Sequence, residues 1–400
     1  MKKIKIGIVW ANPYNKNMGV AALAYSALSI IHDVLKTRGI EEFEVSFIGS
    51  SKNTSDSLVI GTDKIEFDNV FGFDFYNFKA IVKFLLFPRK YKLRKLIGFD
   101  YLFDIAEGDS FTDIYGDKRF NKIKNSKVFF NLLGTKQFLL PQTIGPFKDK
   151  NHEKKAFLIM NKMEAVVSRD NKSFLYTKNH LSATIISESI DVAFYLPFDR
   201  KHFDKTKINV GINVSGLLWN GGYTRNNQFN LKTNFKKLIF NTLRFFYEKE
   251  NVQIYIVSHV VPGKSQEVED DYYAAEELQK TFPNVILAPR FSNPIEAKSF
   301  ISGLDFFTGA RMHACIAAFS SSVAVCPMAY SRKFNGLFVD TLKYKWLGDC
   351  VNSEEVTVLN NIINAFENRV ELVDAIDTSL NEIVYPRIKL LKLHISNIIN

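Results

Sequence analysis

Short apolar segments alternate with longer helical segments along almost the whole chain. The first apolar run covers residues 3–10 and is followed, after a polar loop, by a helix-like segment at 18–36. The same succession starts again at residue 208 and continues to residue 329. Short apolar runs that alternate with helices are typical of buried parallel strands joined by helical crossovers. The alternation therefore predicts an α/β fold built on parallel sheets.

The length of 400 residues indicates two domains. We predict an N-terminal Rossmann-like domain at 1–196 and a C-terminal one at 208–370. The segment between them contains Pro197 and charges of both signs, which favours a linker. Residues 371–400 are apolar enough to pack, and we predict a helix that returns toward the first domain.

Composition excludes a disordered chain, because 46% of the residues are hydrophobic and 24% are charged. The net charge of +10 is compatible with anionic substrates, nucleic acid or an anionic membrane surface. No nucleic-acid-binding signature accompanies that charge, so no nucleic-acid partner is expected. No apolar run approaches the length of a membrane-spanning helix, and the N-terminus reads as a strand rather than a signal peptide.

The three cysteines, Cys315, Cys326 and Cys350, have neither a C-x-x-C pattern nor zinc-ligand spacing. They lie in or beside apolar segments, which is typical of buried free thiols in a reducing cytoplasm. We therefore expect a cytoplasmic protein without a metal site.

Cations gather where two predicted strands end. Arg311 and His313 follow the predicted strand 305–309 at the start of a small-residue helix, and Lys333 follows the next predicted strand, 323–329. The carboxyl ends of parallel strands face the ligand crevice, and helix N-termini attract anions. The pattern predicts a site for a small phosphorylated or carboxylated substrate. The alternative is a set of salt-bridged surface residues.

Carboxylates follow another predicted strand, at 101–106. Glu107, Asp109 and Asp113 lie in one short segment near a glycine, which favours a site over a core position. By contrast, the acidic run at 269–271 is predicted to be a solvated helix start and not a metal site.

Several polar residues have two open interpretations. Asn17 and Gln142 are predicted either to hydrogen-bond substrate hydroxyls or to stabilise their own loops. His259 follows a strand and is predicted either to line the site or to lie at the surface. The loop 215–223 is rich in glycine and aromatic residues, so Trp219 or Tyr223 could stack on a substrate ring.

The segment 78–97 mixes large apolar residues with cations and contains no acids. This composition suits contact with an anionic bilayer. The alternative is a solvated helical hairpin with one core face and Pro88 at its bend.

Taken together, several short motifs in this order resemble the polysaccharide pyruvyl transferase family. They span most of the chain, and only the ordered set is specific. The motifs are Asn17-x-Gly19, Gly108-Asp109-Ser110, the segment 140–147 (LPQTIGPF), Val167-Ser168-Arg169-Asp170 with Ser173, Asp191-x-Ala193-Phe194, Gly309-x-Arg311-x-His313 and Tyr330-x-x-Lys333.

This resemblance implies two Rossmann-like domains facing across a cleft, as in GT-B glycosyltransferases. It also implies transfer of pyruvate from phosphoenolpyruvate onto two hydroxyls of a sugar, which forms a cyclic ketal. The chain departs from the family pattern at Glu107, where a glycine is usual, and at Met312, where a small aliphatic residue is usual.

For the chemistry, we expect His313 to protonate the methylene carbon of phosphoenolpyruvate and Asp109 to take the proton of the attacking hydroxyl, with Asp113 and Glu107 as weaker candidates. Arginine suits bidentate capture of phosphate or carboxylate, and lysine suits neutralisation of a point charge. Phosphoenolpyruvate is a co-substrate, and no further cofactor is expected. The expected catalytic residues are His313, Asp109 and Arg311, the donor-binding residues Arg169, Arg311, Lys333, His259 and Ser215, and the acceptor-binding residues Asn17, Asp109, Ser110, Gln142 and Trp219.

The expected acceptor is a cell-envelope glycan such as an exopolysaccharide or capsule precursor. An undecaprenyl-diphosphate-linked acceptor would place the protein at the inner face of the membrane, with contact through 78–97. Two alternatives stay open. One is a GT-B-type glycosyltransferase that uses a sugar nucleotide, and the other is a non-catalytic glycan-binding protein that kept the fold.

Overall fold

The structure is a computed structural model that describes residues 3–50, 54–60, 62–71, 79, 82–83, 86–89, 95–182, 185–262 and 267–399. The chain divides into two compact units. The first contains Met1–Tyr14, Leu23–Pro197 and Pro386–Asn400, and the second contains Asn15–Ala22 and Phe198–Tyr385. The segment 371–385 therefore belongs to the second unit. Half of 78–97 lies outside the described residues, so its predicted membrane contact stays a prediction.

An eight-stranded sheet forms the centre of the first unit, in the order β3-β4-β2-β1-β5-β6-β7-β8. Every pair in it is parallel except β3 with β4. The strands are β1 (Ile4–Val9), β2 (Phe43–Ser50), β3 (Ser55–Ile60), β4 (Asp63–Phe71), β5 (Tyr101–Asp104), β6 (Lys136–Gln142), β7 (Ala165–Ser168) and β8 (Ile185–Glu188). The helices are α1 (Met18–Thr37), α3 (Asp117–Leu132), α4 (Lys150–Met160), α5 (Asn171–Lys178), α14 (Tyr385–Ile398) and the short turns η2 (Ala106–Gly108) and η3 (Val192–Tyr195).

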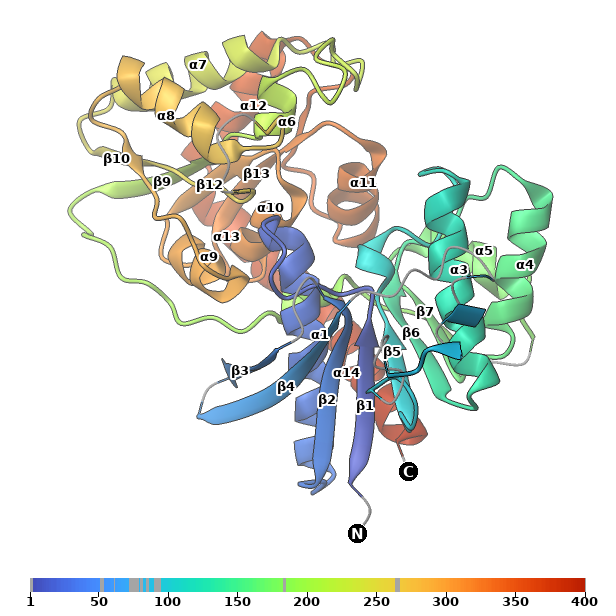
Figure 1. The fold of residues 1–400 in the computed structure, drawn as a ribbon. Helices are drawn as coiled ribbons and strands as arrows, with labels where there is room; N and C mark the ends of the chain where they lie inside the picture. Colours follow the sequence, from blue (N-terminus) through green and yellow to red (C-terminus); the bar gives the residue numbers. More distant parts are fainter. Residues whose placement is uncertain are drawn as a thin grey trace. The chain divides into compact units, whose positions relative to one another are not determined.

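A six-stranded parallel sheet forms the second unit, in the order β11-β10-β9-β12-β13-β14. In Figure 1 helices α7 and α12 lie on one side of this sheet, and α9 and α10 lie on the other. The strands are β9 (Ile208–Asn213), β10 (Val252–Ile256), β11 (Ile286–Leu287), β12 (Phe306–Gly309), β13 (Ala324–Ala329) and β14 (Gly348–Asp349). The helices are α6 (Gly216–Trp219), α7 (Phe235–Tyr247), α8 (Asp271–Thr281), α9 (Pro294–Ile301), α10 (Met312–Phe319), α11 (Arg332–Phe334), η4 (Asn335–Thr341), α12 (Glu355–Glu367), α13 (Arg369–Ser379) and η5 (Leu380–Val384).

Strand order reverses once in each sheet. In the first unit the chain leaves β1 toward β2 on one side and returns to β5 on the other, and in the second unit β9 stands between β10 and β12 in the same way. Ligands of open α/β sheets bind outside the carboxyl ends of the strands at such a reversal. This topology therefore directs attention to the loops after β1, β5, β9 and β12.

Residues Ser55–Ile60 form β3, an edge strand that pairs with β4 in an antiparallel register. One sequence prediction was wrong in this part of the molecule. The helix α1 is long and apolar enough to cross a membrane by length and composition, contrary to the expectation that no run reaches that length. However, 78% of its most apolar window is buried inside the protein, which is typical of a core helix.

The C-terminal helix α14 lies with the first unit except for its first residue. Arg387 donates to the backbone oxygen of Ser189 and forms an ion pair with Glu188 at 2.9 Å. Farther along the helix, Lys392 pairs with Asp33 on α1. These contacts attach the end of the chain to the edge of the eight-stranded sheet and to α1.

Candidate functional site

A buried arginine–aspartate pair lies at the strand-order reversal of the second unit. Arg311 follows β12 directly and is 8% exposed, while Asp271 at the start of α8 is 0% exposed. Arg311 Nη2 donates to Asp271 Oδ1 at 2.8 Å, and Nε donates to the same oxygen at 3.1 Å. The Asp271 carboxylate thus holds one edge of the guanidinium in a fixed plane.

The remaining edge of Arg311 is the part that a ligand could use. Nη2 also donates to the backbone oxygen of Glu269 at 2.8 Å. Among the residues that the structure describes, none accepts a hydrogen bond from Nη1. Asp271 therefore occupies the edge formed by Nε and Nη2, and the predicted capture of a donor anion by Arg311 stays a prediction.

Asp271 also ties together three loops at the carboxyl end of the sheet. Its oxygens accept hydrogen bonds from the backbone N–H groups of Gly216 (2.8 Å), His259 (3.1 Å) and Val260 (3.1 Å). Asn213, the last residue of β9, donates to Asp271 and accepts from the Arg311 N–H at 2.9 Å. These hydrogen bonds fix Arg311 relative to the ends of β9 and β10.

His259 lies beside this cluster and is 3% exposed. Burial lowers the pKa of the His259 imidazole to about 3, and the charges of His313 and Arg311 lower it further. His259 is therefore neutral at pH 7 and can act only as a neutral hydrogen-bonding group. The sequence left open whether His259 lines the site or the surface, and the structure buries it next to Arg311 and His313.

This depressed pKa predicts an acid-sensitive fold. The folded-state value of about 3 lies below the unfolded value of 6.5, so the unfolded chain binds more protons between these values. The contribution of neutral His259 is present above pH 6.5 and is lost as the pH falls toward 3. Between pH 7.5 and 5 the wild type should lose about 2 kcal/mol more unfolding free energy than His259→Gln, since one pKa unit corresponds to about 1.4 kcal/mol. Urea unfolding of both proteins at the two pH values tests this, and equal losses would contradict it.

The other predicted cations of this unit are less deeply placed. His313 lies in the first turn of α10, and its side chain packs against the backbone of Gly19. Lys333 is half-buried in α11, directly after β13. Tyr330, at the end of β13, is close enough to Arg311 for its charge to raise the pKa of the guanidinium, together with Asp271 and Glu269 and against the effect of burial.

A second buried arginine lies in the first unit, at the end of β7. Arg169 is 7% exposed, and its Nη1 donates to Asp191 Oδ2 at 2.7 Å. Its Nε donates to Thr143 Oγ1 at 2.9 Å, and Thr143 in turn donates to Asp170 at 3.1 Å. Burial alone would lower the pKa of Arg169, but Asp191, Asp109 and Asp170 outweigh it and raise that pKa. Several motifs that are far apart in the sequence thus meet at one buried cation.

The loop after β5 brings Asp109 to this arginine. Ala106, Glu107 and Gly108 have positive φ angles of 41°, 51° and 87°. A Cβ on Gly108 would lie 2.9 Å from Leu23 Cδ1 and 3.0 Å from Arg169 Nη1, so only glycine allows the loop to approach the guanidinium. Asp109 itself accepts a hydrogen bond from the Tyr115 hydroxyl at 3.0 Å.

Glu107, where the family pattern has glycine, adopts a left-handed conformation that glycine adopts without strain. Its carboxylate pairs with Arg119, which also donates to Ser110 Oγ at 2.7 Å. Ser110 is 1% exposed, so its predicted contact with an acceptor is replaced by this bond to Arg119.

Three further predicted residues have structural partners. Asp113 accepts from the backbone N–H groups of Lys148 and Asp149, which, with His152, lower its pKa against the effect of burial. Gln142 is 0% exposed and donates to the backbone oxygens of Asp104 and Leu140, so it lies inside the sheet edge. Ser215 is buried and caps α6. These contacts give Asp113, Gln142 and Ser215 partners within the first and second units themselves.

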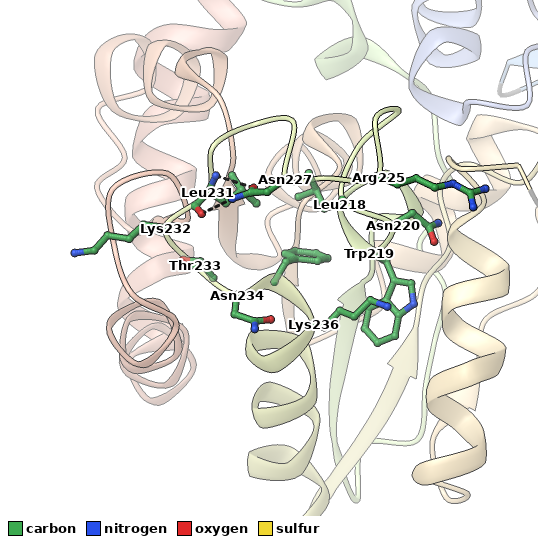
Figure 2. Close-up of a pocket in the computed structure, with 12 residues that line it drawn as sticks. Leu218, Trp219, Asn220, Arg225, Asn227, Leu231, Lys232, Thr233, Asn234 and Lys236 are labelled. Atoms are coloured by element: carbon green, nitrogen blue, oxygen red, sulfur yellow. Dashed lines mark hydrogen bonds between the residues drawn. The ribbon is translucent and has the colours of Figure 1, made fainter.

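A pocket of about 550 Å³ opens in the second unit between the loop 220–231 and the start of α7. Figure 2 shows Lys236 beside the ring of Trp219, while Arg225 and Lys232 extend to opposite sides. The Trp219 indole N–H donates to Glu277 at 2.9 Å, and Lys236 Nζ lies 4.9 Å from the centre of the indole ring. The lining contains three cations and no carboxylate, and consists of Leu218, Trp219, Asn220, Gly221, Arg225, Asn227, Leu231, Lys232, Thr233, Asn234, Phe235 and Lys236.

Sequence reasoning missed Asp271 and Asn213, the two residues that hold Arg311. The run 269–271 was predicted to be solvated, but Asp270 caps α8 and is 4% exposed, and Asp271 is fully buried. The sequence did contain a signal for Asp271: an acidic run close to a strand end can supply the counter-charge of a buried cation. Within the described ranges, no group of three or more His, Cys, Asp or Glu side chains could hold a metal ion.

The two units thus each hold a buried arginine at the carboxyl end of a strand, Arg169 after β7 and Arg311 after β12. The predicted α/β class with two Rossmann-like domains of the GT-B type is confirmed. The family model for polysaccharide pyruvyl transferase matches residues 42–332. The chain therefore belongs to the polysaccharide pyruvyl transferase family, as its motifs predicted, and is a transferase. None of the curated proteins compared with it matches significantly.

Solved structures share this fold at low sequence identity. A putative UDP-N-acetylglucosamine 2-epimerase from Listeria monocytogenes aligns with a TM-score of 0.57 and 10% identity, over 94% of this chain and 90% of that one. A UDP-GlcNAc 2-epimerase from Methanocaldococcus jannaschii gives 0.56 and 10%, over 91% and 92%. A sucrose-phosphate synthase from Thermosynechococcus elongatus gives 0.55 and 8%, over 97% of both chains. These likenesses concern the fold alone.

Proposed function

We propose that this transferase moves pyruvate from phosphoenolpyruvate onto two hydroxyls of a cell-envelope glycan and forms a cyclic ketal. The observation that carries the proposal is the Arg311 cluster. A permanent cation is held by Asp271 with Nη1 directed away from the pair, beside a neutral His259 and the imidazole of His313. Such a cluster suits an anionic donor that must also receive a proton.

In the proposed donor site Arg311 and Lys333 bind the phosphate and carboxylate of phosphoenolpyruvate, and the donor-binding role of Arg169 stays a prediction from the sequence. Phosphoenolpyruvate carries about three negative charges at neutral pH, because the second pKa of its phosphate is near 6. Arg311 is suited to this role because its orientation is set before substrate binds. Lys333 follows β13, the neighbour of β12 in the sheet.

The chemistry starts with proton transfer from His313 to the methylene carbon, which becomes a methyl group. Positive charge develops at the neighbouring carbon, and a sugar hydroxyl attacks it and gives its proton to a general base. The carbon–oxygen bond to phosphate then breaks, and phosphate leaves with the bridging oxygen and a proton. A second hydroxyl closes the ketal, so one phosphoenolpyruvate and one diol give one ketal and one phosphate.

Phosphate release provides the direct test of this reaction. The purified protein is incubated with phosphoenolpyruvate and glycan fractions, and phosphate and the mass of the glycan are measured. The proposal requires phosphate release that depends on glycan and a matching mass increase. Phosphate release without any change in glycan mass, or no release with any fraction, would contradict it. Free and lipid-linked forms of one glycan tested side by side decide whether the acceptor carries a diphosphate and a lipid.

The pocket beside Trp219 supports binding of an anionic acceptor. Its three cations would attract the diphosphate of a lipid-linked glycan or the carboxylate of an acidic sugar, and its asparagines can bond hydroxyls. Replacing both Arg225 and Lys236 with glutamine should raise the acceptor KM roughly ten-fold or more, because each charge-assisted hydrogen bond contributes about 1.5–3 kcal/mol. The kcat at saturating acceptor should stay unchanged.

The matched control for this prediction is Lys237→Gln. Lys237 neighbours the pocket residue Lys236 but pairs with Glu355. An acceptor KM that rises equally in the control would assign the effect to general surface charge. An unchanged KM in the double variant would remove the pocket from the acceptor site.

A further inference from the structure

The turn that opens α1 is built into the second unit. Residues Asn15–Ala22 group with that unit, although the rest of α1 belongs to the first. Asn17 forms an antiparallel bridge with Val260, and the Met18 N–H donates to the backbone oxygen of His259 at 2.9 Å. The loop after β1 is therefore attached to the loop after β10, next to the Arg311 cluster.

Gly19 touches His313 directly. A Cβ on Gly19 would lie 2.5 Å from His313 Nδ1, 2.8 Å from Cγ and 2.9 Å from Cβ. The last of these atoms is fixed to the backbone of α10, so rotation of the imidazole cannot relieve the overlap. The absence of a side chain at Gly19 is thus required for the present position of His313.

Asn17 sets the place of Gly19. The side-chain oxygen of Asn17 accepts a hydrogen bond from the Gly19 N–H at 3.0 Å, as a helix cap does. Asn15 accepts in turn from the Asn17 N–H at 2.9 Å. Side chains of the segment itself therefore stabilise the first turn of α1, independently of its contact with His313.

We propose that Asn17 and Gly19 are positioning residues, which hold the His313 imidazole in place through the backbone of Gly19. This assignment replaces the predicted role of Asn17 as an acceptor ligand, and it rests on the proposed role of His313 as proton donor. Displacement of a reacting group by about 1 Å can cost on the order of 10²-fold in rate. Substitutions here should therefore lower kcat while donor binding through Arg311 and Lys333 persists.

The principal test compares Gly19→Ala with Gly336→Ala. Both glycines lie in helical segments of the second unit, but no described atom lies within 4 Å of a Cβ on Gly336. We expect Gly19→Ala to lower kcat roughly 10–100-fold, with the phosphoenolpyruvate Kd changed less than about three-fold. Gly336→Ala should match the wild type. Imidazole NMR signals of His313, labelled in the full chain, should shift in Gly19→Ala alone.

Asn17 supplies a second test if Gly19→Ala fails to fold. Asn17→Ala removes the cap and should lower kcat and shift the His313 signals, whereas Asn17→Asp keeps an accepting oxygen and should restore both. Unmoved His313 signals in Gly19→Ala and Asn17→Ala would overturn the proposal. Shifted signals in a protein without pyruvyl transfer would uphold the positioning role and overturn only the proposed reaction.

Discussion

Asp271→Ala is expected to lower the free energy of unfolding by about 3–5 kcal/mol, because removal of one partner from a buried ion pair leaves the other charge uncompensated. Arg311 is 8% exposed and has no second carboxylate within hydrogen-bond distance in the described part of the chain. The substitution also removes the acceptor for the N–H groups of Gly216, His259 and Val260. Urea unfolding measures the loss.

The same substitution should abolish binding of phosphoenolpyruvate, because the guanidinium loses the partner that sets its orientation. Asp270→Ala is the matched control, since Asp270 is the neighbouring acid and only caps α8. Loss of a cap costs about 0.5–2 kcal/mol and should leave binding intact. If the two variants were equally stable, Asp271 would not be the counter-charge of Arg311.

His313→Gln should reduce kcat by roughly 10²–10⁴-fold, the usual contribution of a positioned general acid. Glutamine is polar and close to histidine in size, but its amide cannot deliver a proton to carbon. The phosphoenolpyruvate Kd should change little, because Arg311 and Lys333 stay in place. Single-turnover kinetics beside calorimetric binding separates the two effects.

A control for this variant is His180→Gln. His180 is exposed in the first unit, where its ring stacks on Phe157. Its replacement should leave turnover as in the wild type. Full turnover of His313→Gln would assign the proton to another group, and loss of binding with unchanged kcat would make His313 a ligand for the donor instead.

Sequence patterns located the strands that carry the site because strands of a parallel sheet are buried on both faces. The residues of β12 and β13 are all buried and none of them is charged, while charged residues follow within a few positions of each strand end. The change from uncharged strand residues to cations after the strand end was enough to find Arg311 and Lys333. The order of the sheets and the clustering of Arg169 with Asp191 required the three-dimensional structure.

The missed elements depend on partners that are distant in sequence. Strand β3 begins with the polar residues Ser55, Asp56 and Ser57, and it is an edge strand that pairs with β4 alone. The sequence around Asp271 resembles a solvated acidic run. Its partner Arg311 is 40 residues away, so only the three-dimensional structure shows the ion pair. Gln142 was predicted either to contact substrate or to stabilise its own loop, and its buried amide donates to the backbone oxygens of Asp104 and Leu140. A sequence motif can therefore contain residues that bind substrate and also residues that stabilise the surrounding backbone.

Calorimetric titration of the full chain with phosphoenolpyruvate, beside a panel of sugar nucleotides and with Arg311→Ala as the control, tests the central claim most directly. The account predicts saturable binding of phosphoenolpyruvate that is lost in the variant, and no binding of the sugar nucleotides. Binding of one sugar nucleotide without binding of phosphoenolpyruvate, with or without glycan present, would contradict it and would favour a GT-B-type glycosyltransferase.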